Sequence, residues 1–207
     1  DPTNYNAYQQ LSGIYGNIDN YGVHDMEQAL FYADQAANTF LSNLEQKGWS
    51  IEEMGLSNAD YEQILGGLTV QRAQLQFNLG QEDPTKYSDA IDTARFYLDI
   101  NGENNNVRNI LGWSYFNTDS VDDAISEWET IQDDEEGHVG ANRGLIRGYT
   151  LKGKYSNARK QLKQRIDYLK SNGAKLDAQL KNFDKLSERE KFELMDQWNK
   201  LQGELRE

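Results

Sequence analysis

The sequence predicts an all-α protein, and three observations support that prediction. Proline occurs only at Pro2 and Pro84, so helices can run long without interruption. No stretch shows the sustained alternation of β-branched residues that is typical of strands. Apolar residues instead recur at the three- and four-residue spacing of a helix face, between short turns that contain glycine.

The first helices are expected where a capping residue precedes an apolar face. A short helix over about 4–15 opens the chain. Asp25 can cap a second helix that runs to about Lys47 and ends at Gly48. The apolar face of this second helix consists of Leu30, Ala33, Ala37, Leu41 and Leu44.

The remaining helices follow at regular intervals. Asn58 can cap a third helix that runs to about Leu79, with Gly80 after it. Gly66-Gly67 lies inside this third pattern and indicates close helix packing or a kink. Further helices are expected over about 86–99, 105–117, 120–132, 139–152, 155–171, 174–186 and 188–205, with turns at Gly102, Gly137, Gly153 and Gly173.

Composition narrows the classes of partner. The 207 residues are 37% apolar, enough to bury a core, and contain no cysteine, so there is no disulfide or thiolate metal site. Lys and Arg number 21 against 34 Asp and Glu, a net charge of −13 that argues against nucleic acid and anionic lipid as partners. No run approaches the roughly 20 apolar residues of a membrane span.

The charge is unevenly distributed along the chain. Residues 1–84 contain two basic and twelve acidic side chains, and residues 85–150 contain five and thirteen. Residues 151–207 reverse the balance, with fourteen basic and nine acidic side chains. This asymmetry between an acidic body and a basic tail indicates how the molecule associates with others rather than how it folds. The alternative interpretation is that the charges only form a solvated surface.

A repeat with a period of 34 residues relates successive helix pairs. Shifting the chain by 34 aligns Leu111 with Leu145, Tyr115 with Tyr149, Val121 with Tyr155, Ala124 with Ala158 and Trp128 with Leu162. The same shift relates Val121 and Ala124 to Tyr87 and Ala90, and Tyr149 to Phe183. Small residues at these positions let helices approach, and the large ones are expected to fill the gaps between adjacent hairpins.

In this pattern the sequence resembles the tetratricopeptide repeat family. The best copy is Leu111-Gly112-Trp113-Ser114-Tyr115, followed by Ala124 and Trp128. The resemblance implies a right-handed α-solenoid of about four to five helix-turn-helix hairpins that stack because none buries its face alone. Two positions depart from the family pattern: Arg108 and Asn142 replace its early Trp, and its boundary Pro is missing.

The repeat predicts a single domain over 1–207. Its hairpins are degenerate over 1–57 and better formed over 58–172. A degenerate repeat and a capping helix are expected over 173–207.

The resemblance also implies a site, because first helices in this family line a concave groove that holds a peptide or partner helix. The residues that map to this groove are Asn106, Asn109, Trp113, Phe116, Arg143, Arg147 and Lys181, with Thr150 as a further candidate. Arg143 and Arg147 share one helical face and can bind a carboxylate bidentately. This is similar to the family's carboxylate clamp, although Trp113 stands where that clamp has Asn. The alternative is that both arginines pair with Asp133–Glu136 or other local acids.

Catalysis finds little support in the sequence. His24 and His138 precede helices and lack a second ligand at metal spacing. There is no phosphate-binding loop and no Gly-x-Ser-x-Gly motif. The acidic run Asp133-Asp134-Glu135-Glu136 lacks the spaced ligands of a calcium loop and indicates a solvated turn. We therefore predict no enzyme activity, no cofactor and no metal.

The last expected helix is a candidate oligomer surface. Ser187 and Glu190 form a plausible capping box, and a wide apolar stripe follows, made of Phe192, Leu194, Met195, Trp198, Leu201 and Leu205. This stripe either covers the last repeat or contacts another copy. In the second case the basic C-terminal end would meet the acidic N-terminal end of a neighbour, a heterologous contact that yields rings or filaments.

The sequence therefore favours a non-enzymatic scaffold that binds a protein or peptide in its groove. The alternative is a structural subunit that self-assembles head to tail. The chain begins at Asp1 rather than Met, which fits removal of a targeting segment or trimming of the chain. The amide- and Tyr-rich opening and the absence of cysteine favour a bacterial protein in the periplasm or at the cell surface, with the cytoplasm as the alternative.

Overall fold

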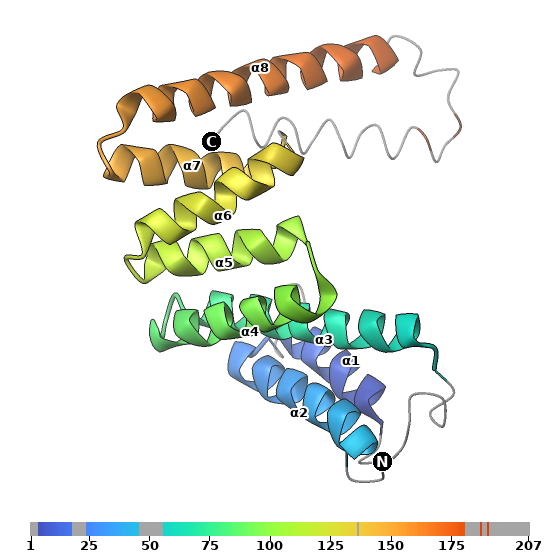
Figure 1. Cartoon of the computed structure of the whole chain (residues 1–207). Coiled ribbons are helices and arrows are strands. Elements are labelled where there is room, and N and C mark those ends of the chain that lie inside the picture. Colours follow the sequence, from blue (N-terminus) through green and yellow to red (C-terminus); the bar gives the residue numbers. More distant parts are fainter. Residues whose placement is uncertain are drawn as a thin grey trace. The chain divides into compact units, whose positions relative to one another are not determined.

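The computed structural model describes residues 4–17, 24–45, 56–135 and 137–180, together with Ser187 and Glu190. Within these ranges the chain forms eight helices and no strand, so the predicted all-α fold is confirmed (Figure 1). The chain divides into two compact units, Asp1–Glu135 and Glu136–Glu207. The prediction of one continuous repeat domain, with boundaries at 57 and 172, stays a prediction.

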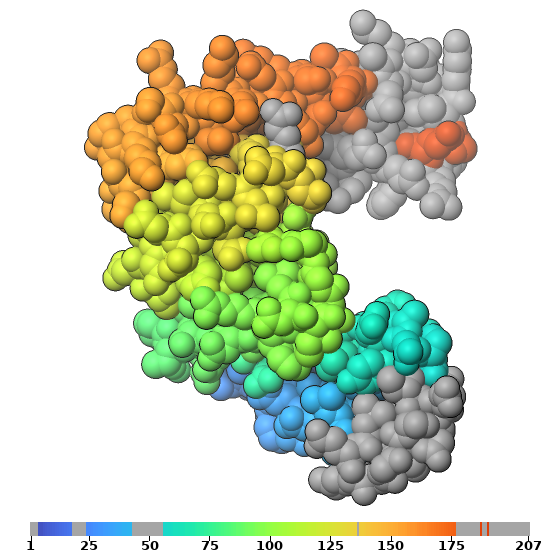
Figure 2. Space-filling view, viewed as in Figure 1, coloured from blue at the N-terminus to red at the C-terminus, as the bar shows by residue number. Residues whose placement is uncertain are grey.

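Consecutive helices pack as hairpins within each unit. The first unit contains α1 (Tyr5–Gly16), α2 (Met26–Glu45), α3 (Asn58–Leu79), α4 (Thr85–Asn101), α5 (Asn105–Asn117) and α6 (Val121–Asp134). Here α1 packs on α2, α3 on α4 and α5 on α6, while the α2–α3 and α4–α5 contacts join these hairpins (Figure 1). Figure 2 shows the visible segments of the first unit following one another in chain order, from blue to yellow. In the described part of the second unit, α7 (Val139–Leu151) packs on α8 (Tyr155–Leu180).

Side-chain caps fix where several helices begin. Asp25 caps α2 as predicted, since its Oδ1 accepts the Gln28 amide at 2.9 Å. The prediction that Asn58 caps α3 is wrong by one residue, because Ser57 is the cap: its Oγ accepts the Asp60 amide at 3.1 Å, while the Asp60 carboxylate accepts the Ser57 amide at 3.0 Å.

The predicted capping box between Ser187 and Glu190 is present. The Glu190 carboxylate accepts the Ser187 amide at 2.8 Å, and the Ser187 hydroxyl accepts the Glu190 amide at 3.4 Å. The predicted helix over 188–205 and its apolar stripe otherwise lie outside the described residues.

Two of the expected glycine turns are left-handed, and one expected turn is absent. Gly102 and Gly153 have φ of 77° and 69°, which suits the residue after a helix. The prediction of a turn at Gly173 is wrong, because α8 runs unbroken from Tyr155 to Leu180. A single glycine costs a helix only about 1 kcal/mol relative to alanine, and no proline follows it here.

The core of the α5–α6 hairpin explains the strongest repeat residues. A Cβ on Gly112 would stand 2.6 Å from Nε1 of Trp128, whose side chain is fully buried, so glycine permits the close approach of the two helices. Trp128 therefore fills the gap within its own hairpin, with its ring 4.9 Å from that of Trp113, and not the gap between hairpins as predicted. Tyr115 does lie between hairpins, because the Arg95 guanidinium of α4 stands 5.3 Å from its ring.

Candidate partner-binding site

A hollow of about 720 Å³ lies between α1 and α3, the first helices of two consecutive hairpins. Its walls come from these two helices, and Tyr97 of α4 contributes at one end. The described lining is unusually rich in glycine and in side-chain amides. The glycines are Gly13, Gly16, Gly66 and Gly67, and the amides are Gln9, Asn17, Gln63, Gln71, Gln74 and Asn78.

Two of these glycines face open space. Among the described residues, a Cβ on Gly13 or on Gly67 would have no neighbour within 4 Å, although both glycines lie inside helices. By contrast, a Cβ on Gly66 would stand 3.2 Å from the Tyr97 ring, so packing accounts for that residue. Glycine inside a helix costs about 0.5–1 kcal/mol relative to alanine. Packing does not explain why this cost is retained at Gly13 and Gly67, whereas close approach of a ligand to the helix backbone would.

The amides of the hollow are placed to form hydrogen bonds. Gln71 Nε2 donates to the hydroxyl of the fully buried Ser12 at 3.0 Å, which ties α3 to α1. Gln74 Nε2 donates to Oδ1 of Asn78 at 2.9 Å. Each carboxamide carries two N–H donors and one carbonyl acceptor, so these contacts leave further donors and acceptors on the same groups. Carboxamides of this kind can donate to the C=O groups and accept from the N–H groups of a bound segment.

The electrostatics of the first unit oppose an acidic ligand in this hollow. Glu62 is the only charged side chain among the described lining residues. The first unit as a whole contains 24 acidic and five basic side chains, whereas the second contains ten and sixteen. A neutral or basic segment therefore fits the hollow better than a carboxylate-bearing one.

Of the groove residues predicted on α5, Trp113 and Phe116 form part of an aromatic cluster. Trp113 and Phe116 are partly buried, with ring centroids 5.8 Å apart, and both contact the buried Trp128. Asn106 is exposed. Asn109 is partly buried, and its Oδ1 is shielded from solvent without a hydrogen-bond donor. These four predicted residues therefore lie on the same helix, α5. Their role in binding stays a prediction.

The other predicted groove residues belong to the second unit or lie outside the description. Arg143 and Arg147 are exposed on α7, four residues apart as predicted. Thr150 is exposed near the end of the same helix. Lys181 and the stripe from Phe192 to Leu205 lie outside the described residues.

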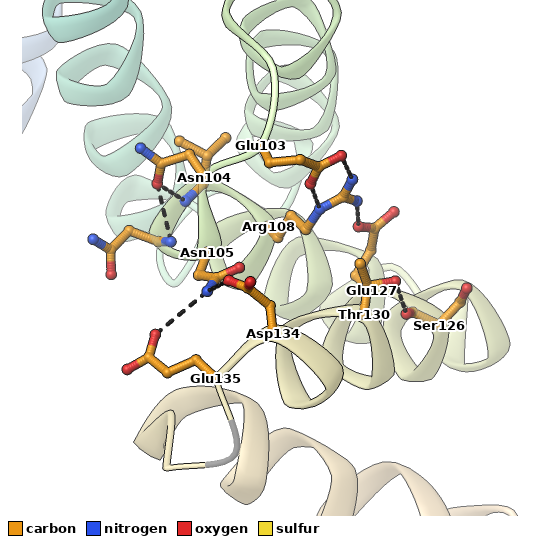
Figure 3. Close-up of polar contacts among 11 residues, drawn as sticks. Glu103, Asn104, Asn105, Arg108, Ser126, Glu127, Thr130, Asp134 and Glu135 are labelled. Atoms are coloured by element: carbon orange, nitrogen blue, oxygen red, sulfur yellow. Dashed lines mark hydrogen bonds and ion pairs between the residues drawn. The ribbon is translucent and has the colours of Figure 1, made fainter.

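Sequence reasoning missed an ion-pair clamp at Arg108, the position where the family pattern has Trp. Figure 3 shows the guanidinium between Glu103, which precedes α5, and Glu127 of α6. Its Nε and Nη2 donate to the two Glu103 oxygens at 2.6 and 2.7 Å, and Nη1 donates to Glu127 at 2.6 Å. The hydrogen bonds from Arg108 hold the pKa of Glu103 below its usual range. The clamp fixes the start of α5 on α6.

His138 and the acidic run make contacts that stabilise helix ends, and His24 lies at the surface. His138 caps α7, because its Nδ1 accepts the Ala141 amide at 3.1 Å, and His24 is exposed ahead of α2. Asp134 accepts a hydrogen bond from Asn105 Nδ2 at 2.7 Å. The described part of the chain contains no group of three His, Cys, Asp or Glu residues placed to hold a metal ion. Likewise, no described helix is both long and apolar enough to cross a membrane.

The fold is that of a helical-hairpin repeat protein, and its α1–α3 hollow is open and lined by both apolar atoms and amide side chains. No family model and no curated protein matches the chain. Among solved structures it is similar to YrrB, described as a TPR protein with an unusual peptide-binding site, at 17% identity, covering 77% of this chain and 84% of that one, with a TM-score of 0.45. It is also similar to MamA AMB-1, at 18% identity over 80% and 86% of the two chains with a TM-score of 0.45, and to MamA MSR-1, at 16% over 80% and 90% with a TM-score of 0.43.

Proposed function

We propose that the chain is a non-enzymatic interaction module that binds an extended, neutral or basic peptide segment of a partner protein in the α1–α3 hollow. The main chain of the segment would lie against the helix backbone at Gly13 and Gly67. The surrounding carboxamides would supply donors and acceptors to its C=O and N–H groups. Because the lining is uncharged apart from Glu62, hydrogen bonding rather than charge would give the register of the bound segment.

The single observation that supports this proposal most is the open space at two helix-interior glycines. Alanine at Gly13 or Gly67 would meet nothing in the described protein and would favour the helix. A binding site that needs close approach to the backbone accounts for glycine at both positions. Natural proteins commonly give up stability of this size at sites that bind.

The residues predicted from the repeat extend the proposal to two further patches, one on each unit. On α5, Trp113 and Phe116 provide partly buried aromatic anchors of the kind that dominate binding energy at interfaces. On α7 of the basic second unit, Arg143 and Arg147 would donate hydrogen bonds to a carboxylate. Replacing both arginines with Glu tests this extension: unchanged capture of an acidic peptide, with intact helicity, would remove it.

The hollow itself is tested with a displayed library of random linear peptides. Peptides selected on the wild-type chain are measured against Gly13→Leu and Gly67→Leu, which fill the hollow from its two walls. The proposal expects selected peptides to be neutral or basic and to lose binding to both variants. Peptides that bind all chains equally would refute it.

A matched control separates filling of the hollow from a general effect of added leucine. Ala7→Leu on α1 and Ala59→Leu on α3 place the same side chain at exposed positions of the same helices, outside the hollow. Both controls are expected to bind the selected peptides as the wild type does. Far-UV circular dichroism verifies that all four variants keep their helical content.

A second candidate function is self-assembly as a structural subunit. One observation favours it: the boundary between the two compact units, at Glu135–Glu136, falls close to the change of charge along the chain. The first unit has a surplus of 19 acidic side chains and the second a surplus of six basic ones. Two copies would therefore attract through unlike units at low ionic strength. An extracytoplasmic location remains part of this proposal, and fractionation of the native cells tests it.

A further inference from the structure

Among the described residues, an exposed apolar stripe on α8 lacks the aromatic partner that its repeat counterpart on α6 has. Trp128 of α6 is fully buried against Trp113, whereas Leu162, its equivalent one repeat later, is 48% exposed. The position equivalent to Trp113 is Arg147, which is itself exposed on α7 and offers no ring for Leu162 to cover. Ile166, one turn further along α8, is 41% exposed.

The stripe on α8 is bordered by basic side chains. Arg159, Lys163 and Lys170 lie three or four residues from Leu162 or Ile166, so they share its side of the helix, and all three are exposed. Between Tyr155 and Leu176, α8 contains six basic side chains and one acidic one, Asp167. We call Leu162, Ile166 and these three cations the α8 stripe.

A matching surface with acidic edges lies on α4 of the first unit. Phe96 and Ile100 are 47% and 46% exposed and have the same four-residue spacing as Leu162 and Ile166. Asp92 and Asp99 lie one turn from Phe96 on either side and are exposed. We call these four residues the α4 stripe.

Beside Phe96 the surface is hollowed between α2 and α4, over a volume of about 450 Å³. Its apolar lining includes Leu30, Ala37 and Leu41 of α2. Its cations are paired with acids, Arg72 Nε with Asp34 at 2.7 Å and Lys86 Nζ with Asp89 at 3.4 Å, which leaves Asp92 to set the sign of the rim. Burial raises the pKa of the Asp34 carboxyl despite the Arg72 pair.

We propose that the α8 stripe of one copy docks on the α4 stripe of a second copy, with Leu162 and Ile166 against Phe96 and the α2–α4 hollow. This inference rests on self-assembly, the second candidate function above, and identifies its surfaces. The basic side chains beside Leu162 and Ile166 would face Asp92 and Asp99. Because the two stripes differ, the contact is heterologous and repeats from copy to copy into a ring or filament.

A second copy is the occupant that the charges favour. Each chain carries one donor stripe on its basic unit and one acceptor stripe on its strongly acidic unit, so copies match one to one. The apolar residues of both stripes are four residues apart, which fits the packing of one helix on another. The opposite charges at the edges of the two stripes would set the orientation of the contact. Attraction between the exposed charges falls as salt rises, because the Debye length shrinks.

Sedimentation velocity of the full chain tests the contact at low salt and at about 0.5 M salt. The variants are Asp92→Lys with Phe96→Ser, which breaks the acceptor, and Leu162→Ser with Lys163→Glu, which breaks the donor. The wild type is expected to associate at low salt and to dissociate at high salt. Each variant is expected to self-associate at least about ten-fold more weakly than the wild type, because truncating a central interface residue commonly causes a loss of this size.

An equimolar mixture of the two variants gives the sharpest result. The acceptor variant keeps its α8 stripe and the donor variant keeps its α4 stripe, so the mixture is expected to stop at complexes of two molecules. The control Glu82→Lys with Leu151→Ser changes one exposed acid and one exposed apolar residue outside both stripes, and is expected to assemble as the wild type does.

Three results would overturn the inference, and they differ in what else they remove. A wild type that associates at low salt, with both variants equally associated, refutes these surfaces but leaves self-assembly standing. A wild type that stays monomeric at low salt and high concentration removes self-assembly as well. Loss of thermal stability in the donor variant without change in association would assign the α8 stripe to the chain's own residues 188–205.

Discussion

Alanine substitution at two classes of helix-interior glycine should change stability in opposite directions. At Gly67 the new Cβ would have no neighbour within 4 Å, so the substitution gains the helix preference of alanine, about 0.5–1 kcal/mol, without a packing cost. At Gly112 the Cβ would stand 2.6 and 2.9 Å from Nε1 and Cε2 of the buried Trp128. Overpacking of this kind costs about 1–3 kcal/mol, which exceeds the same gain. We expect a net loss of about 1 kcal/mol.

Urea denaturation followed by far-UV circular dichroism measures both changes. The midpoint should rise for Gly67→Ala and fall for Gly112→Ala, with similar slopes, because neither change alters the surface exposed on unfolding. Gly13→Ala, with the same open surroundings, should behave like Gly67→Ala. If Gly67→Ala and Gly112→Ala destabilise the chain equally, α3 is packed at Gly67 and the hollow is not open as described.

Three further substitutions, at Arg108, Glu103 and His138, concern the starts of α5 and α7. Replacing Arg108 with Met should lower the free energy of unfolding by about 1–2 kcal/mol, between the values for exposed and buried pairs, because the Glu127 side chain is only 20% exposed. Glu103→Gln should cost less, since that side chain is 75% exposed. Because the folded-state pKa of Glu103 is lowered, its contribution to the free energy of unfolding is present above the unfolded-state pKa. This contribution is lost as pH falls through the folded-state pKa. A plot of urea midpoint against pH should show the loss in the wild type and not in Arg108→Met.

His138→Ala removes the cap of α7 and should cost about 1 kcal/mol, with faster hydrogen exchange at the Ala141 amide.

The sequence was sufficient to predict helix starts and ends wherever neighbouring residues alone determine them. Asp25 satisfies the first amides of α2, and Gly102 supplies the positive φ after α4, and both effects depend only on neighbouring residues. Gly173 failed as a turn signal because a lone glycine is a small cost, which the rest of a 26-residue helix outweighs. Ser57 was missed as a cap because adjacent Ser and Asn are nearly equal in capping preference.

Packing partners were harder to predict than helix positions. The repeat placed Trp128 and Tyr115 on buried faces, and both are buried. Spacing alone does not say whether a face meets its own hairpin or the next, so Trp128 was assigned to the wrong gap. Arg108 was noted only as a departure from the family pattern, because its partners Glu103 and Glu127 are brought together by the turn of the hairpin.

The best-formed candidate site was missed for a similar reason. The repeat is strongest over 105–162, so the family resemblance directed attention to α5 and α7. The signal in α1 and α3 was glycine inside amide-rich helices, and at Gly66 the packing interpretation is correct. Only the folded structure distinguishes Gly66, where a Cβ would meet the Tyr97 ring, from Gly67, where a Cβ would have no described neighbour within 4 Å.

The most direct test of the central claim is an NMR titration of the ¹⁵N-labelled chain with a peptide selected from the random library. If the peptide binds in the α1–α3 hollow, saturable shifts are expected for the backbone amides of Gly13 and Gly67 and for the Gln71 side-chain amide. Shifts confined to the Trp113 indole and the side chains of Arg143 and Arg147 would move the binding site to the residues predicted from the repeat. Such a result would contradict the assignment of the α1–α3 hollow.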